Sequence, residues 1–277
     1  MIAIVCMKWG TAFDAEKVNV LFRSVRANLQ MDFRFFCMTD EPVGLEDGIA
    51  ALPIPEMNLS DRAWRKGCWP KLGVFKPGLF SSYSAVLFLD LDLMVVGPLA
   101  PLIQPVLEHG TIFTLREWNP ALLSLLPLWM RPDRGVQSSV FVFRPGDVDY
   151  IYEDFIQDPE KALRRASNDQ RYLTVVLPKR RYLPRRYYVS FKHDCVKYFP
   201  LGRIWPEIRK PGRAHIVVFH GNPRPWDLLG PAGKRWGTSR KFGHGAVDWV
   251  RDHFLLYGDQ QDGDAGIHQK RQRLSTA

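Results

Sequence analysis

One apolar run that ends in two carboxylates constrains the fold of this chain more than any other feature. Residues 85–89 read AVLFL, and Asp90 and Asp92 follow directly. A continuous apolar run of this length is typical of a strand buried on both faces of a parallel sheet. Two carboxylates one residue apart repel each other and lose hydration unless a cation offsets their charge. The run therefore predicts a central strand with a Mg²⁺ or Mn²⁺ site at its carboxyl end, and two solvated aspartates are the alternative.

The first hundred residues alternate between strand and helix patterns. Strands are predicted at 2–7 and 33–38, and a short helix at 71–80. An amphipathic helix is predicted at 15–29, because Val18, Leu21, Phe22, Val25 and Leu29 recur at helical spacing. This order is typical of a doubly wound nucleotide-binding α/β sheet, where ligands collect at the carboxyl ends of the strands.

The length and composition favour one large domain. The chain has 277 residues, of which 46% are hydrophobic, and this is enough material for a sizeable core. We expect a single domain over 1–257, with a nucleotide-binding half at 1–100 and an acceptor and catalytic half at 101–257. Residues 258–277 are polar and predict a flexible tail. The four cysteines are far apart, which predicts reduced thiols and no zinc site.

The second half of the chain carries a second group of polar residues at the end of a strand. Strands are predicted at 138–143 and 214–219, and helices at 148–155 and 168–176, the latter capped by Asn168. The strand at 214–219 runs into His220, Gly221 and Arg224. An imidazole can complete a metal site, glycine lets the backbone approach a ligand, and a guanidinium matches phosphate oxygens. A histidine that is simply hydrogen-bonded at the end of a strand is the alternative.

Charge is unevenly distributed along the chain. Residues 1–130 carry 11 Lys and Arg against 13 Asp and Glu, a net charge of −2, whereas residues 131–277 carry 27 against 16, a net charge of +11. The dense basic cluster at 179–186 fits an anionic substrate, an anionic membrane surface, nucleic acid or a solvated surface strip. The apolar run at 121–130 is too short to span a membrane. It predicts core packing, with an acceptor lid or a membrane-touching patch as alternatives. No signal peptide or spanning segment is evident, so we expect a cytoplasmic protein. A peripheral location at the inner membrane surface is the alternative.

Together, the D-x-D motif at 90–92 and the segment H-G-x-x-R-P-W at 220–226 resemble glycosyltransferase family 8. These retaining enzymes have the GT-A fold and use nucleotide-diphosphate sugars. The resemblance implies a GT-A type α/β fold with a mixed central sheet flanked by helices, and hexosyltransferase activity (EC 2.4). It also implies that Asp90, Asp92 and His220 hold Mn²⁺ or Mg²⁺, and that a UDP-sugar is the donor. Arg224 stands where the family usually has lysine.

Further roles follow from the same resemblance. It implies that one set of residues contacts the nucleotide-sugar: Lys8, Trp9, Gly10, Thr39, Asp40, Lys71, Asp90, Leu91, Gly221 and Arg224. For Lys71 a solvated surface lysine is the alternative. The segment 168–170 resembles the family's D-Q-D segment, which implies that Asp169 and Gln170 lie beside the reacting carbon, although Arg171 replaces the last aspartate. The motifs at 7–10, 138–141 and 190–192 are similar to those of a bacterial group of cytoplasmic glycosyltransferases.

The acceptor is not specified by any motif. It is expected to be anionic or membrane-associated, such as a cell-surface glycan or glycolipid precursor, and no stable protein partner is expected. Three alternatives to this function remain: a glycosyltransferase acting on nucleic acid, a Mg²⁺-dependent phosphatase of the haloacid dehalogenase class, and a non-catalytic nucleic-acid-binding protein. The phosphatase class carries its nucleophile after the first strand, whereas the D-x-D motif here begins at residue 90.

Overall fold

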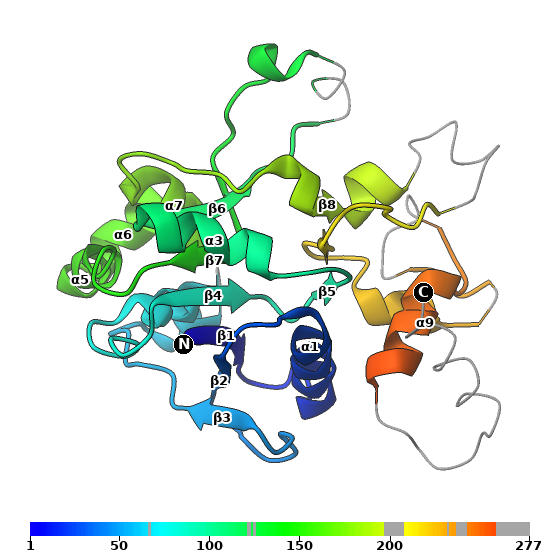
Figure 1. Cartoon of the computed structure of the whole chain (residues 1–277). Helices are drawn as coiled ribbons and strands as arrows, with labels where there is room; N and C mark the ends of the chain where they lie inside the picture. Colours follow the sequence, from blue (N-terminus) through cyan, green and yellow to red (C-terminus); the bar gives the residue numbers. More distant parts are fainter. Residues whose placement is uncertain are drawn as a thin grey trace.

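A six-stranded mixed sheet forms the centre of the molecule (Figure 1). The computed structural model describes residues 1–65, 68–120, 123, 126–196, 208–231, 233–236 and 243–258. The strand order is β3-β2-β1-β4-β7-β6; β3, β2, β1 and β4 run parallel, and β7 is antiparallel to both of its neighbours. The strands are β1 (Ile2–Lys8), β2 (Phe33–Thr39), β3 (Ile49–Leu52), β4 (Ala85–Leu89), β6 (Ile112–Arg116) and β7 (Val136–Phe143). The predicted α/β class and mixed central sheet are confirmed.

Both faces of the central sheet are covered, which is why β1 and β4 are apolar throughout. Ile4 and Cys6 of β1 face a core formed with α1 (Ala15–Asn28) and α3 (Ala100–His109). The alternate residues Ala3 and Val5 face a second core. The elements on that side are η1 (Trp69–Phe75), α5 (Tyr150–Gln157), α6 (Pro159–Arg165) and α7 (Asp169–Val176). Alternating side chains along one strand thus place a helical layer on each face.

A second, three-stranded sheet lies beside the first. It consists of β5 (Leu93–Val95), β9 (Ile216–Val218) and β8 (Tyr188–Ser190), in the order β5-β9-β8. It packs in a core of its own against η4 (Phe191–Cys195), η5 (Pro225–Leu229) and α9 (Asp248–Tyr257). Because β5 follows the D-x-D motif directly and pairs with β9, residues 90–92 come to lie beside residues 219–221. The bond from the Phe219 amide to the Asp92 carbonyl, 3.3 Å, marks this junction.

Several sequence predictions need correction. The helix predicted at 71–80 is a 3₁₀ turn over Trp69–Phe75, because Pro77 forces Lys76 into an extended conformation with ψ of 126°. The strand predicted at 214–219 is shorter, Ile216–Val218, and lies in the second sheet. The remaining short elements, which the sequence did not predict, are α2 (Asp61–Arg65), η2 (Leu128–Met130) and η3 (Arg185–Tyr187).

The prediction of core packing is wrong for the end of the apolar run at 121–130. Trp129 is 84% exposed and Met130 49% exposed, on a segment that projects between β6 and β7 (Figure 1). Residues 121, 122, 124 and 125 of that run lie outside the described residues, as does the predicted tail from residue 259 on. All four cysteines are free thiols, as predicted. Among the described residues, no helix combines the length and apolar character needed to cross a bilayer.

Candidate active site

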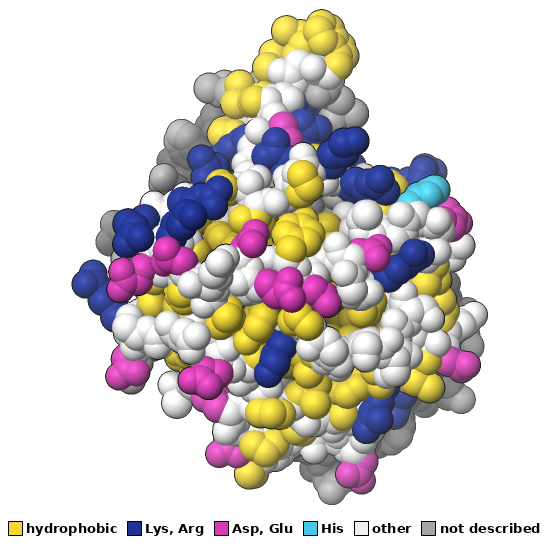
Figure 2. Space-filling model, turned by 90° about the vertical axis from the view of Figure 1, so that its left-hand side faces the viewer, with side chains coloured by type: hydrophobic (Ala, Val, Ile, Leu, Met, Phe, Trp, Pro, Cys, Tyr) yellow, Lys and Arg dark blue, Asp and Glu magenta, His cyan; other side chains and the backbone are white. Residues whose placement is uncertain are grey.

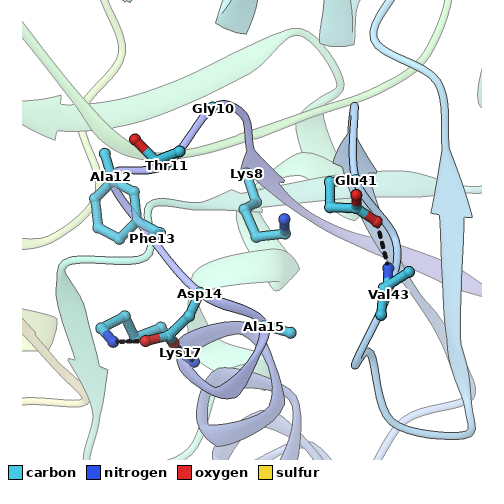
Figure 3. A pocket seen from close by; sticks show the side chains of 10 residues that line it. All are labelled: Lys8, Gly10, Thr11, Ala12, Phe13, Asp14, Ala15, Lys17, Glu41 and Val43. Carbon is cyan, nitrogen blue, oxygen red and sulfur yellow. Dashed lines mark hydrogen bonds and ion pairs between the residues drawn. The ribbon is translucent and has the colours of Figure 1, made fainter.

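A pocket opens at the carboxyl ends of β1 and β2, against the first turn of α1 (Figure 3). It has a volume of about 510 Å³. Its lining residues are Lys8, Gly10, Thr11, Ala12, Phe13, Asp14, Ala15, Lys17, Glu41 and Val43. The volume lies in the roughly 300–1,000 Å³ range of small-molecule sites. The pocket is therefore large enough for a nucleotide and lies at the edge where parallel α/β sheets bind their ligands.

The two loops expected to meet the nucleoside lie together here. The Gly10 amide donates a hydrogen bond of 2.9 Å to the Asp40 carboxylate, which joins the loop after β1 to the turn after β2. Thr39 is buried, and its hydroxyl accepts a bond from the Glu41 amide. Trp9 is half-buried and packs against the core on the η1 face. The structure thus brings Gly10 and Asp40 together beside Lys8, while Trp9 serves the packing of the core.

The late segment that carries Arg224 contacts two residues that line the pocket, Phe13 and Lys17. The Arg224 guanidinium lies 4.8 Å from the centre of the Phe13 ring and 5.7 Å from that of Trp226. Across from it, the Lys17 ammonium lies 5.1 Å from the Trp226 ring. Cation–π contacts of this kind hold a charged group over an aromatic face while leaving it able to bind an anion. Arg224 therefore lies against Phe13, a lining residue, although it does not itself line the pocket.

A buried ion-pair cluster lies at the end of β4. The Lys71 ammonium is 2.7 Å from one carboxylate oxygen of Asp90 and 3.5 Å from an oxygen of Asp169. Lys71 also donates to the Ser138 carbonyl at 3.3 Å, and the Ser138 hydroxyl donates to Asp169 at 2.8 Å. Lys71 and Asp169 are both buried. Lys71 is thus a buried partner of two carboxylates, not the solvated surface lysine of the alternative prediction.

The charges in this cluster shift one another's protonation. Burial lowers the pKa of Lys71, but Asp90 and Asp169 outweigh that effect, and the pKa is raised above its ordinary value. Burial raises the pKa of Asp90 to about 7, opposed by Lys71 and reinforced by Asp92 and Asp169. Two carboxylates therefore contact one buried ammonium and a third, Asp92, acts on Asp90, an excess of negative charge that a cation would relieve.

Asp92 lies outside the ion-pair cluster, beside the segment that carries His220. The Gly221 amide points at the Asp92 carboxylate from 3.4 Å. The His220 Nε2 atom is 2.7 Å from the Ser190 hydroxyl, and Lys192 donates to the His220 carbonyl at 2.8 Å. His220 has φ of 33° and Gly221 has φ of 84°, both in the left-handed region. A non-glycine residue in this region is strained, and such strain often occurs at functional sites.

The chemistry of these groups fits a divalent cation. Burial lowers the pKa of His220 to about 3, with smaller effects from Lys192 and His193, so its imidazole is neutral near pH 7 and can act as a ligand. Asp90 and Asp92 provide the hard oxygen ligands that Mg²⁺ and Mn²⁺ prefer. Within the described residues, however, no three such side chains are gathered closely enough to hold a metal ion. Asp90 is paired with Lys71, and His220 with Ser190.

Two neighbouring residues, Glu117 and Trp118, were missed by the sequence analysis. The Gln170 amide donates to the Glu117 carboxylate. The Trp118 indole stacks on the His220 ring, with centroids 5.0 Å apart and an interplanar angle of 27°, and its N–H donates to Asp194 at 3.2 Å. Both residues follow β6, whose sequence IFTLR is an apolar-rich run that the sequence analysis did not assign. Recognising that strand would have placed a carboxylate and an indole at its end.

Comparisons with known proteins agree with this architecture. No protein-family model matches the sequence, and no curated protein matches it either. The galactosyltransferase LgtC, solved in complex with donor and acceptor sugar analogs, has a similar structure with a TM-score of 0.55 at 14% identity, covering 97% of this chain and 99% of that one. The bifunctional glycosyltransferase WbbM gives a TM-score of 0.58 at 13% identity, covering 98% of this chain and 52% of that one. GlyE of Streptococcus pneumoniae gives 0.53 at 12% identity, covering 83% and 57%.

These similarities show the fold. The chain has the α/β architecture of LgtC, the GT-A fold, over nearly the whole length of both proteins. It spans about half of the length of WbbM and GlyE.

Proposed function

We propose that this chain is a metal-dependent glycosyltransferase that moves a hexose from a UDP-sugar to an acceptor with retention at the anomeric carbon. Two observations carry the proposal: in a GT-A fold, Asp92 contacts the segment His220–Gly221, and a pocket of about 510 Å³ opens at the carboxyl ends of β1 and β2. Sequence segments about 130 residues apart are brought together there. Asp92 follows β4, and the pocket lies at the ends of β1 and β2. The carboxyl ends of parallel strands are where α/β sheets bind nucleotides.

The pocket supplies the nucleoside site in this proposal. Lys8, Gly10 and Asp40 lie around the uridine, because the Gly10–Asp40 hydrogen bond joins the two loops that border the pocket. Arg224 faces the diphosphate, since a guanidinium can form two parallel hydrogen bonds with phosphate oxygens. LgtC, solved with donor and acceptor sugar analogs, supports a nucleotide-sugar as the ligand.

The carboxylates and the imidazole serve the metal in this proposal. Asp90, Asp92 and His220 would hold Mn²⁺ or Mg²⁺, which when bound neutralises charge on the departing diphosphate. Lys71 compensates Asp90 and Asp169 from the buried side. Ser190 and Trp118 fix the imidazole, the first by a hydrogen bond and the second by stacking. The positioning of His220 thus depends on two elements of the second half of the chain, β8 and the segment after β6.

Asp169 and Gln170 are assigned to the sugar side of the site. Retention requires the acceptor to approach from the leaving-group side, or a covalent intermediate. Glu117 holds the Gln170 amide, and Ser138 and Lys71 hold the Asp169 carboxylate, so neither side chain is free to rotate. A solved active-site mutant of LgtC replaces a glutamine by glutamate, which supports a glutamine in this role. Proton NMR of the anomeric coupling in the product tests retention, and an inverted product contradicts the assignment.

A screen of nucleotide-sugars for hydrolysis, with and without Mn²⁺, tests the proposed function. We expect hydrolysis of one or a few UDP-sugars, lost on chelation and lost in Asp92→Asn. The matched control is Asp32→Asn, since Asp32 is exposed at the opposite end of the sheet, before β2. Hydrolysis that persists in Asp92→Asn and after chelation would refute the metal-dependent reaction. The phosphatase alternative gains no support, because the carboxylate pair follows β4 and the first strand ends at Lys8.

A further inference from the structure

The segment between β6 and β7 projects from the body of the molecule and ends in exposed apolar side chains (Figure 1). We define the apolar tip as Leu126, Pro127, Trp129 and Met130. Trp129, at 84%, has the largest exposed fraction of the large hydrophobic residues in the described part of the chain. Figure 2 shows hydrophobic side chains gathered at the top of the molecule, the level to which this segment rises in Figure 1. Exposed apolar patches of this kind mark binding surfaces.

Hydrogen bonds hold the tip in shape. The Met130 amide donates to the Pro127 carbonyl at 2.9 Å, and the Arg131 side chain donates to the Leu126 carbonyl at 2.7 Å. Arg116, at the end of β6, donates to the Arg131 carbonyl at 3.3 Å and so ties the tip to the sheet. The Leu126 and Pro127 carbonyls are therefore bonded within the segment, while Pro127, Trp129 and Met130 are exposed to solvent. Because these bonds already order the segment, little further conformational entropy is lost when its apolar side chains bind another surface.

Cations surround the base of the tip. We define the basic collar as Arg131, Arg134, Lys179, Arg180 and Arg181. Arg180 forms an ion pair of 3.2 Å with Asp133, and the Tyr182 hydroxyl donates to the same carboxylate at 2.7 Å. These contacts place the segment 179–182 against the base of the projection. Asp133 is the single acid in the segments 126–134 and 179–186, and Figure 2 shows Lys and Arg side chains below the apolar top.

We propose that the apolar tip and the basic collar together dock this protein on an anionic lipid bilayer. Tryptophan prefers the interface between headgroups and acyl chains, where its ring is buried and its N–H stays hydrated. Arginine and lysine next to it meet the lipid phosphates. Nucleic acid would use the collar but gain little from Leu126 and Met130. A protein partner would use the tip but need no excess of cations. The bilayer uses both.

Docking in this way places the candidate active site near the lipid surface. The Arg134 side chain donates to the Trp118 carbonyl at 2.6 Å, so the base of the projection contacts the residue that stacks on His220. An acceptor anchored in the bilayer would then meet the site from the side of the tip. The docking surface itself does not depend on sugar transfer, and its test needs no donor.

The test is flotation of the full chain with vesicles, either of phosphatidylcholine alone or of phosphatidylcholine mixed with phosphatidylglycerol. We expect binding to the anionic vesicles that weakens as salt screens the collar. The double variant Arg180→Ser/Arg181→Ser removes two cations, each worth about fivefold in partitioning. Trp129→Ser should weaken binding to anionic vesicles at every salt concentration. The matched controls are Arg34→Ser/Lys76→Ser and Val43→Ser, which change exposed residues outside the tip and collar and should bind vesicles as wild type does. Val43 lines the pocket, so its variant is a control for vesicle binding alone and not for donor hydrolysis.

Three outcomes overturn the proposal. The first is a wild-type protein that does not float with anionic vesicles, or floats equally with neutral ones. The second is a loss in the control variants as large as that in Trp129→Ser, with all variants folded by circular dichroism. The third is duplex DNA that displaces the protein from vesicles and binds Trp129→Ser as tightly as wild type, which would assign the collar to nucleic acid. Donor hydrolysis in the same variants is a separate readout, so failure of docking and failure of the proposed enzyme activity are distinguishable.

Discussion

Replacing Lys71 by methionine should destabilise the protein strongly, and by an amount that depends on pH. The ammonium lies 2.7 Å from Asp90 and 3.5 Å from Asp169, and its side chain is 6% exposed. Methionine keeps most of the volume but leaves two carboxylates without their cation. Removing one partner of a buried ion pair costs about 3–5 kcal/mol. This is a large part of the total stability of a typical domain, about 5–15 kcal/mol.

The pH dependence separates this charge effect from a packing defect. Without Lys71, the folded-state pKa of Asp90, which burial already raises to about 7, rises further above the value near 4 of an unfolded aspartate. The folded variant then binds more protons than the unfolded one, so its stability increases as pH falls. The difference between wild type and Lys71→Met in free energy of unfolding should therefore be largest near pH 8 and shrink toward pH 5. Urea unfolding followed by tryptophan fluorescence measures both quantities.

A control and a metal titration complete this experiment. Lys8→Met removes another buried lysine, one for which the described residues show no carboxylate within ion-pair distance, and its cost should vary little with pH. Added Mn²⁺ should raise the urea midpoint of unfolding of Lys71→Met more than that of wild type, because a bound cation replaces the compensating charge that the carboxylates have lost. A Lys71→Met variant that is as stable as wild type, or equally destabilised at pH 5 and pH 8, would show that Lys71 does not compensate these carboxylates.

Three more predictions follow from individual contacts. Arg224→Ala should weaken binding of UDP by about 1.5–3 kcal/mol, the range for a hydrogen bond to a charged group, and leave uridine unaffected in calorimetry; equal losses for both ligands would indicate a damaged pocket. Burial lowers the pKa of His253 to about 3, so the stability it contributes is lost as pH falls below about 6.5. From pH 7 to pH 5 this loss is about 2 kcal/mol, and it should be absent in His253→Phe; an unchanged pH dependence of urea unfolding in the variant would contradict it. Gly221→Ala should cost roughly 1–2 kcal/mol of strain, since φ is 84° and the added methyl group meets only the Lys192 ammonium at 3.8 Å. Gly212→Ala, in open space, is its control in thermal unfolding, and equal costs would argue against strain.

The sequence by itself determined four strands of the central sheet, β1, β2, β4 and β7, and the carboxylates that follow β4. The run at 85–89 is apolar at every position, and only a strand covered on both faces uses such a run in a sheet. The helix at 15–29 was evident because its apolar residues recur at the helical period. Asn168 was identified as a cap, and its side chain accepts a bond from the Arg171 amide. These features depend on interactions over a few residues, which the local pattern records.

Only the tertiary structure decided how those carboxyl ends combine. The pairing of β5 with β9 brings Asp92 to His220, and the buried position of Lys71 follows from the packing of η1 under β4 and β7. Neither leaves a periodic signal, because each depends on contacts between segments far apart in the chain. The same limit hid Glu117 and Trp118, whose contacts come from Gln170 of α7 and from His220, which follows β9. Trp129 shows the converse: its apolar run reads as core, and only the projection of the segment from the sheet places it in solvent.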